Sequence, residues 1–394
     1  MKRTLVALAA MASLGAMAET SMTVYGVIDG GLRQDSNAAK TSAGGTQSQT
    51  QFLNGALNTS RFGFKGTKDL QSGLKANFKL ESGFTEGNGQ DAGNVVNPAV
   101  TAVPQTASTY SKNTLFDRTA SAGLQGTWGA LDLGRVTTFA YDLNAGYVTD
   151  PLGLEMTNNN HYVAAKAFNI NPQGLAIQSS FFTVRRDNSF KYMGTFGGLS
   201  VGAAYSLANV AGSQSAGSSM QAMAKYSGEG YTLAASTDSL QDANSLKQTL
   251  STFGGNVTVS GFKITAGGTQ LSTPAGFAPV ASSFTSNSYS NPSGFIVGGV
   301  ATAQTKINVA NLGVAYQMGL FNIVGGYYNA QIQQGSLANN TVNSLIVRVR
   351  YALDPSTDLY VEADSSKATG LDVSKSAGLS LTDTGFTAGL QYRF

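Results

Sequence analysis

The stretch Gly385–Phe394 reads GFTAGLQYRF and alternates between apolar and polar residues. Its apolar positions are Phe386, Ala388, Leu390, Tyr392 and Phe394. Because successive side chains of a β-strand point to opposite faces, this period of two predicts a strand with one apolar and one polar face. Two interpretations fit this stretch alone. It is either an ordinary amphipathic strand or a strand that turns its apolar face to lipid and its polar face to a wet lumen.

A predicted hairpin between Ser60 and Phe84 has the same alternation in both of its strands. SRFGFKGTKDL and LKANFKLESGF are joined by the short turn QSG, which is typical of a hairpin. A basic side chain at the bilayer midplane costs roughly 2–4 kcal/mol, whereas one in a lumen costs little. We therefore expect the Phe and Leu face to contact lipid and the charged face to line a lumen. The charged positions are Arg61, Lys65, Lys75, Lys79 and Glu81.

Further strand pairs follow along the chain, each joined by a tight turn. With a first strand at Thr23–Leu32 and a last at Gly385–Phe394, we count about sixteen, an even number as bacterial barrels require. Long polar stretches such as Thr85–Lys112 and Ser272–Lys306 separate the pairs. Short turns at one end and long loops at the other predict an all-β fold, a closed antiparallel transmembrane β-barrel. A sandwich or propeller lacks this consistent alternation.

The composition agrees with this fold class. Charged residues make up 12% of the 394 residues, about half the usual share, and 47 residues are glycine. The absence of cysteine fits an exported protein without disulfides. Without Lys2 and Arg3, the 25 basic and 22 acidic residues become 23 and 22, a formal charge of +1. A charge this small argues against nucleic acid as a partner.

The first residues have the pattern of a secretory signal peptide. Lys2 and Arg3 precede a mostly apolar run, and Ala16 and Ala18 give the small-x-small cleavage pattern before Glu19. The apolar run is too short for a membrane helix, and no later stretch reaches the roughly 18 apolar residues that a helix needs. We expect residues 1–18 to be a signal peptide and residues 19–394 to be one barrel domain, exported through the secretory pathway.

The sequence gives little support to enzymatic or metal chemistry. Residues 198–202 read GLSVG and match the G-x-S-x-G pattern of serine hydrolases, which needs a strand-to-helix turn and a histidine. Here the pattern opens an alternating strand, and the only histidine is His161, in a predicted loop. No cysteine or histidine cluster is present, and no acidic spacing resembles an EF-hand. We expect no catalytic residues, no metal and no cofactor. A barrel enzyme and a barrel adhesin are both less favoured than a barrel with a water-filled lumen.

Several segments together resemble the trimeric general porins of Gram-negative outer membranes, particularly those of betaproteobacterial type. They are TVYGVID, SRFGFKGTKDL, LKANFKLESGF, LDLGR, YALDPSTDLYVEAD and QYRF, in this order. The resemblance covers the whole mature chain and implies a sixteen-stranded barrel whose third external loop folds inward. It implies a water-filled channel for passive diffusion of small hydrophilic solutes and ions. It also implies a homotrimer in the cell outer membrane, in contact with lipid, lipopolysaccharide and the barrel assembly machinery.

In such porins the C-terminal strand is the assembly signal, here carried by Phe386, Leu390, Tyr392 and Phe394. The expected barrel closure pairs this strand with Thr23–Leu32. Small and apolar residues support close packing in lipid, so we expect Gly26 and Gly30 to let a neighbouring copy approach the outer face.

The resemblance also assigns residues to the pore constriction. Arg61, Arg135 and Lys191 match basic wall positions. Arg135 shares the parity of Leu131 and Leu133, so it faces the lumen only if a bulge forms at Gly134. The facing of Arg118 stays open for the same reason. The inserted constriction loop spans about residues 139–187, with the acidic candidates Asp142, Asp150 and Glu155. Residues 168–184 of the loop also fit an extra strand.

Selectivity should follow from the local placement of charge, because the mature net charge is almost zero. We expect Lys65, Lys75, Lys79 and Glu81 to lie at the pore constriction together with the residues named above. Basic residues exceed acidic ones there, which predicts a weak anion preference. Arg348 and Arg350 should contribute little, since Glu362 and Asp364 on the next strand offset them. A general porin and a substrate-preferring porin are both compatible with this pattern.

Overall fold

The computed structural model describes residues 20–40, 46–70, 72–89, 115–154, 184–278, 303–335, 340–369 and 382–394. The predicted signal peptide with Ala16 and Ala18, the candidate Glu155 and residues 168–183 lie outside the described residues. The described chain is almost entirely β-strand, with the short helix α2 (Phe139–Ala145) after the sixth strand. No helix in the described ranges is long and apolar enough to cross a membrane.

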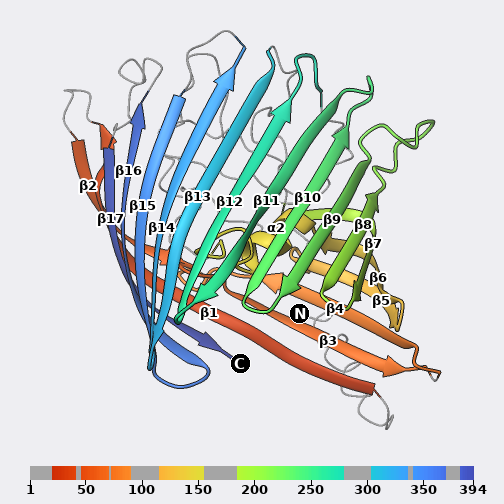
Figure 1. The fold of residues 1–394 in the computed structure, drawn as a ribbon, viewed down its shortest axis with the longest axis horizontal. Helices are drawn as coiled ribbons and strands as arrows, with labels where there is room; N and C mark the ends of the chain where they lie inside the picture. Colours follow the sequence, from red (N-terminus) through yellow and green to blue (C-terminus); the bar gives the residue numbers. More distant parts are fainter. Residues whose placement is uncertain are drawn as a thin grey trace.

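Seventeen strands form a single sheet in which each strand runs antiparallel to its neighbours. Figure 1 shows β11 to β16 side by side along one wall. The bounds of the strands are β1 (Thr20–Lys40), β2 (Thr46–Asn54), β3 (Arg61–Asp69), β4 (Lys75–Gly83), β5 (Thr119–Gly126), β6 (Gly129–Thr137), β7 (Arg185–Phe196), β8 (Leu199–Ser206), β9 (Ser219–Gly228), β10 (Tyr231–Gln241), β11 (Lys247–Val259), β12 (Phe262–Thr273), β13 (Thr305–Met318), β14 (Phe321–Gln334), β15 (Asn340–Ala352), β16 (Thr357–Thr369) and β17 (Thr382–Arg393).

The sheet closes into a barrel through β1. Val27 to Asp35 of β1 pair with β17, so the first and last strands meet as the alternation predicts. On its other edge β1 pairs first with β3 and then with β2. These two strands therefore share one position in the wall, and the seventeen strands occupy sixteen positions. The predicted closed sixteen-stranded antiparallel barrel is confirmed, although β1 is longer than the expected Thr23–Leu32 because it continues along β2.

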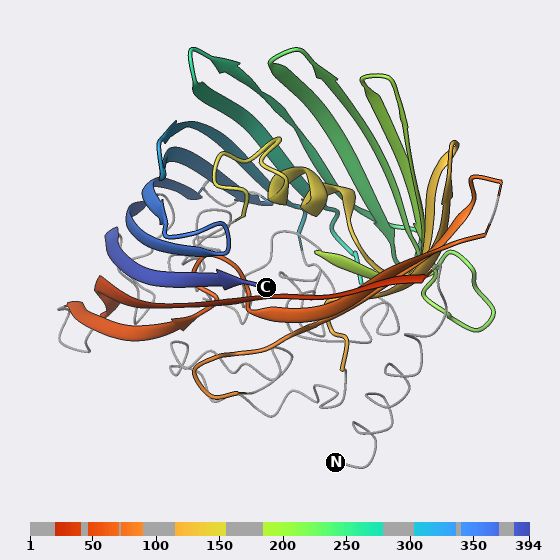
Figure 2. The ribbon, with the colours of Figure 1, turned by 90° about the horizontal axis from the view of Figure 1, so that it is seen from below.

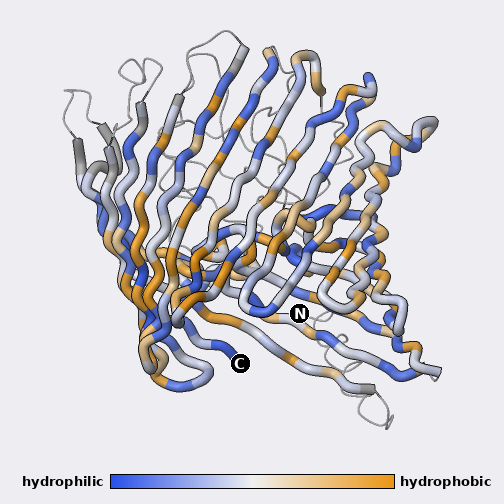
Figure 3. Tube along the Cα trace, viewed as in Figure 1, coloured by the Kyte–Doolittle hydropathy of each residue, from blue (hydrophilic) through white to orange (hydrophobic). Residues whose placement is uncertain are grey.

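The two faces of the wall differ as the alternation predicts. Along β1, Leu32 is 61% exposed on the outer face, whereas Asp29 and its neighbour Arg33 are fully buried inside. On β15, Leu345 is exposed and Arg348 is buried. Figure 3 shows this alternation as apolar and polar residues that succeed one another along most strands. The strands thus present a lipid-compatible exterior and a polar interior.

Aromatic pairs lie near the tight turns, on the outer face. Phe262 and Tyr316 stack with ring centroids 4.5 Å apart, and Phe321 lies 4.8 Å from Tyr351. Trp128 stacks on Tyr192 beside another turn. Aromatic rings gather at the membrane–water interface of outer-membrane barrels, so this band marks one edge of the apolar zone.

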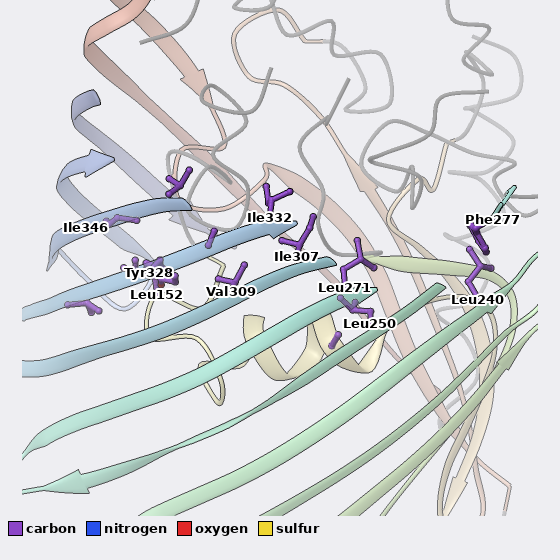
Figure 4. Packing of buried hydrophobic residues seen from close by; sticks show 14 residues of the cluster. Leu152, Leu240, Leu250, Leu271, Phe277, Ile307, Val309, Tyr328, Ile332 and Ile346 are labelled. Atoms are coloured by element: carbon purple, nitrogen blue, oxygen red, sulfur yellow. The ribbon is translucent and has the colours of Figure 1, made fainter. Parts of the chain in front are cut away.

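One part of the inner wall is apolar. Side chains of β10 to β15 form a buried cluster that includes Leu250, Ile307, Val309 and Tyr328 (Figure 4). Leu152, from the segment that follows α2, packs into the same cluster and is fully buried. The apolar inner surface is therefore covered by the chain itself, and it positions the inserted segment described next.

Candidate functional site

The inserted segment, here residues 138–154, begins where β6 ends and lies inside the ring of strands (Figure 2). Thr138 caps α2 by accepting a 3.3 Å hydrogen bond from the backbone N–H of Tyr141. Phe139 and Leu143 of the helix are buried against the inner wall, in a cluster with residues of β8, β9 and β10. An apolar face on the first helical turns thus holds the start of the segment to the wall.

Glycines of the wall make room for the rest of the inserted segment. A Cβ atom added to Gly267 of β12 would lie 2.0 Å from the carbonyl oxygen of Thr149. One added to Gly313 of β13 would lie 2.4 Å from the Cβ atom of Pro151. Only glycine permits so close an approach of the segment to the backbone of the wall, so these residues set how deeply the segment lies against the wall.

Asp150 has a structural position in this segment. Its carboxylate is fully buried and accepts hydrogen bonds from the backbone N–H groups of Leu152 (2.9 Å) and Leu154 (3.2 Å). The hydroxyl of Tyr328 on β14 donates a third, at 2.6 Å. Asp150, one of the acidic candidates of the loop, joins the segment to β14.

Basic side chains gather on the opposite part of the wall, around β3 to β7. We define the arginine cluster as Arg61, Arg118, Arg135, Arg185 and Arg186. The strands from which they come are neighbours in the sheet, although the residues span a large part of the sequence. Four of the five are at least nine-tenths buried, and Arg61 is half-buried.

The side chain of Arg118 points into the barrel, which settles its open facing. Its Nε donates a 2.7 Å hydrogen bond to Oε1 of Glu81. The other oxygen of Glu81 accepts a 2.8 Å bond from the hydroxyl of Tyr25 on β1. Arg61 lies close to Glu81 and Tyr25, and its Nη1 donates a 3.0 Å hydrogen bond to the carbonyl oxygen of Thr59. Glu81 thus serves as the central acid of the cluster.

Arg135 occupies an irregular point in β6. The register between β6 and β7 shifts between Gly134 and Val136, and Gly134 has a φ of +121° that favours glycine. The side chain of Arg135 is 9% exposed and donates from Nε to the carbonyl oxygen of Asp117 at 2.7 Å. It also forms an ion pair with Asp187. The irregularity lies where the sequence pattern required a bulge.

Lys191 of β7 contacts the inserted segment directly. Its Nζ forms an ion pair with Asp142 of α2 and donates to the carbonyl oxygen of Thr137 at 2.8 Å. The same Nζ lies 4.7 Å from the ring centroid of Phe139. A basic wall residue therefore faces an acidic residue of the segment. Both were among the constriction candidates that the resemblance to porins indicated.

Two residues of the arginine cluster were absent from the sequence-based set. Arg186 forms an ion pair with Asp238 of β10 at 2.8 Å. The guanidinium of Arg185 lies 5.7 Å from the ring centroid of Tyr141, and its buried Nε has no hydrogen-bond partner among the described residues. The signal that could have found them is the arginine doublet at the point where the long loop returns to a strand.

Tyr141 places a phenol within the arginine cluster. Burial raises the pKa of this hydroxyl, but the positive charges of Arg118, Arg185 and Arg61 together outweigh burial and lower the pKa below its ordinary value. The field at this point of the lumen therefore favours negative charge.

The remaining candidates on the hairpin lie closer to the turns. Lys65 and Lys79 are directly opposite each other on β3 and β4. Lys75 pairs with Asp69 next to the tight turn, away from the arginine cluster.

The acids expected to offset Arg348 and Arg350 are arranged differently. Glu362 lies opposite Arg348 as expected. Asp364 instead receives a bidentate pair of hydrogen bonds from Arg33, at 2.6 and 2.9 Å. Arg350 forms an ion pair with Asp358. The difference arises because β1 extends past Leu32 and brings Arg33 inward beside β17.

The candidate assembly residues lie at the closure of the barrel. Phe386, Leu390 and Tyr392 are exposed on the outer face of β17. Phe394 exchanges two backbone hydrogen bonds with Gly26 of β1, at 2.9 and 3.1 Å. Its ring stacks on Tyr392, with centroids 6.1 Å apart.

Comparison with known proteins agrees with this architecture. Residues 4–371 match the family model of Gram-negative porins. An outer membrane porin protein of Bordetella pertussis is 34% identical over 218 residues, or 52% of this chain. That match spans 48% of the relative, so the chain matches about half the length of this curated protein.

Solved porin structures have the same fold. An anion-selective porin from Comamonas acidovorans has a TM-score of 0.65 at 19% identity, covering 95% of this chain and 100% of that one. The trimer form of OmpT from Vibrio cholerae has a TM-score of 0.60 at 12% identity, covering 95% of this chain and 100% of that one.

The closed barrel with a polar interior defines the class of outer-membrane β-barrel proteins. The chain belongs to the Gram-negative porin family, and its localisation is the outer membrane.

Proposed function

We propose that the barrel is a water-filled channel for the passive diffusion of small hydrophilic solutes and ions, with a weak preference for anions. The observation that carries this proposal is the arginine cluster on the lumen wall, opposite the inserted segment. Around β3 to β7, apart from Lys68, Asp69 and Lys75 beside the tight turn, eight basic side chains meet six acidic ones, an excess of two positive charges. The basic residues are Arg61, Lys65, Lys79, Arg118, Arg135, Arg185, Arg186 and Lys191, and the acidic residues are Glu81, Asp117, Asp132, Asp142, Asp187 and Asp238.

The distribution of apolar and polar surface supports a wet lumen. The apolar inner wall of β10 to β15 packs against Leu152 and Ala140 of the inserted segment. On the wall of β3 to β7, the accessible charged side chains of Lys65, Lys79 and Arg61 can be solvated by water or permeating ions. We infer that the pore is narrowed between this basic wall and the inserted segment. Passive diffusion needs no catalytic residue. A porin that prefers one class of solute would be a more specific form of the same function.

Arg61→Ala is expected to lower the anion preference and to raise the conductance slightly. Arg61 forms no ion pair with an acidic side chain among the described residues and lies near the positive charge of Arg118, so its own charge is poorly compensated. Removing one charge within a screening length of the pore should reduce the anion-to-cation permeability ratio by about 1.5- to 3-fold at moderate salt. Reversal potentials in planar bilayers under a salt gradient measure this ratio.

Folding should be unaffected by this change, as judged by heat-modifiable gel mobility. A wild-type channel that strongly prefers cations, or an Arg61→Ala channel with wild-type selectivity, would contradict the proposed placement of charge.

We also propose that the protein is a homotrimer whose outer face contacts lipid and lipopolysaccharide. The outer surface beside the closure is apolar, with Val24 at 53% exposure and Leu390 at 43%. Gly26 and Gly30 are covered by the chain's own Phe394 and Phe52 rings, so a neighbouring copy would contact those rings rather than the glycines. Residues 1–18 would act as the signal peptide, and the last strand as the signal read by the barrel assembly machinery.

Cross-linking of the purified protein in mild detergent is expected to give a species of three chains. Apolar side chains on the closure-side outer face lose little on leaving lipid, and close packing of these side chains favours association. Native mass measurement provides the independent reading. If only single chains are found at several protein concentrations, the trimer is ruled out.

A further inference from the structure

A second basic site lies on the lumen wall, on the turn side of the arginine cluster. It is a cavity of about 390 Å³ formed by β1 and β3 to β7. Three lysines line it, Lys65, Lys79 and Lys191, and Asp132 is the only acidic residue of the lining within the described part of the chain. Hydroxyl groups supply most of the remaining polar lining, namely Ser21, Thr23, Thr67, Thr119, Ser121 and Thr137.

The two lysines at its centre are directly opposed. The register of β3 and β4 pairs Lys65 with Lys79, and both ammonium groups lie over the ring of Tyr25, at 5.2 and 5.8 Å from its centroid. Like charges directly opposite each other on one face of a sheet are destabilising. On the outer sides of this pair the register places Thr23 and Ser121, so a row of hydroxyl, ammonium, ammonium and hydroxyl crosses four strands.

The acidic residues nearby neutralise this pair only in part. Lys79 forms an ion pair with Glu81 at 3.3 Å, but Glu81 also accepts hydrogen bonds from Arg118 and Tyr25. Asp132 lies opposite Lys191 in the next row. Lys65 has no ion pair with any acidic residue that the structure describes, and it is exposed to the lumen. The side chain of Lys79 is 44% exposed, against 9% for that of Arg118.

We propose that this cavity binds a compact dianion, either inorganic phosphate or the phosphate group of a small ester. Two ammonium groups on directly opposed residues can approach one tetrahedral group, which removes their mutual repulsion. The flanking hydroxyls can donate to the remaining oxygens. Because both lysines are accessible, the dianion stays partly hydrated and binding has a small desolvation cost. The site would hold permeating phosphate on the turn side of the constriction. This role in permeation rests on the proposed channel function.

Equilibrium dialysis of labelled inorganic phosphate against the purified folded protein tests the site without any measurement of current. In about 0.1 M chloride, we expect one phosphate per chain. Lys65→Gln and Lys79→Gln should each weaken binding about 10- to 100-fold, the loss of one charged hydrogen-bond donor. Lys65→Arg should retain most of the affinity. Lys75→Gln is the matched control, because it removes the same charge from the same face of β4 beside the turn.

Three results would overturn the site: no binding by folded wild-type protein, unchanged binding by folded Lys65→Gln or Lys79→Gln, or displacement of phosphate by an equal concentration of succinate. Gel mobility before and after heating identifies the folded variants. Bilayer recordings separate this proposal from the channel. If the protein conducts with anion preference but does not bind phosphate, the channel is supported and the phosphate site is overturned. If it binds phosphate but does not conduct, the site is supported and the channel is overturned.

Discussion

Asp29→Ala is expected to destabilise the folded barrel by about 3 kcal/mol or more. The carboxylate of Asp29 is fully buried and accepts four hydrogen bonds. Two come from the backbone N–H groups of Leu57 (3.1 Å) and Asn58 (3.2 Å), one from the hydroxyl of Tyr360 (2.9 Å) and one from the amide of Gln391 (2.6 Å). Removing the acceptor takes this partner away from the buried donors of Leu57, Tyr360 and Gln391.

The position of Asp29 explains why the effect should spread beyond one residue. It lies where β1 meets β17, so its partner Gln391 belongs to the last strand and Tyr360 to the strand before it. Its backbone partners belong to the interruption between β2 and β3. A single carboxylate thus joins the closure of the barrel to the segment between β2 and β3. Opening of the barrel should therefore begin here in the variant.

The measurement is the temperature at which the folded form is lost on a heat-modifiable gel, supported by denaturant unfolding in detergent. Asp69→Ala is the control, because Asp69 is exposed beside a tight turn and should change stability by less than about 0.5 kcal/mol. A wild-type midpoint for Asp29→Ala would show that the hydrogen-bond network does not secure the closure.

The double variant Arg61→Glu/Arg185→Glu is expected to reverse the ion preference. Around β3 to β7 it converts an excess of two positive charges into an excess of two negative charges. The permeability ratio should then change by roughly 10-fold or more at moderate salt, since four unit charges differ near the pore. Glutamate at residue 185 would still have Arg118 and Arg135 nearby, so the new carboxylates acquire partners and the barrel should fold.

The matched control for this variant is Lys75→Glu/Lys225→Glu, which changes the formal charge equally. Lys75 lies beside the first tight turn, and Lys225 lies on β9, so neither belongs to the arginine cluster. The control should shift the reversal potential far less than the cluster variant. Equal shifts would show that selectivity responds to total charge rather than to the arginine cluster.

Much of the fold could be predicted because alternation is a local property of the chain. The hairpin around Lys65 and Lys79 and the terminal strand at Phe394 each showed their facing in a few residues. The irregularity at Gly134 was also predictable, since Arg135 had the wrong parity for a charged residue on a regular strand. Strand number and closure then followed from the requirement that no edge stays unpaired in lipid.

The pairing of charges was harder to predict, because a sequence pattern gives the face of a strand but not its register with distant neighbours. Arg33 and Asp364 are 331 residues apart and meet only because β17 brings β1 and β16 together. Asp150 was a pore candidate because of its loop position, whereas its contact with Tyr328 on β14 follows from where the inserted segment runs. Such contacts depend on tertiary geometry that local periodicity does not encode.

The wall glycines behind the inserted segment have a consequence for the evolution of pore size. Gly267 and Gly313 lie on β12 and β13 against Thr149 and Pro151 of the segment, and neither strand carries a residue of the arginine cluster. A methyl group at either position would displace the segment away from β12 and β13 and reduce the space left in the lumen. The exclusion limit of the channel can therefore change through substitutions at the wall glycines behind the segment, while the charges that select the permeating solutes stay the same.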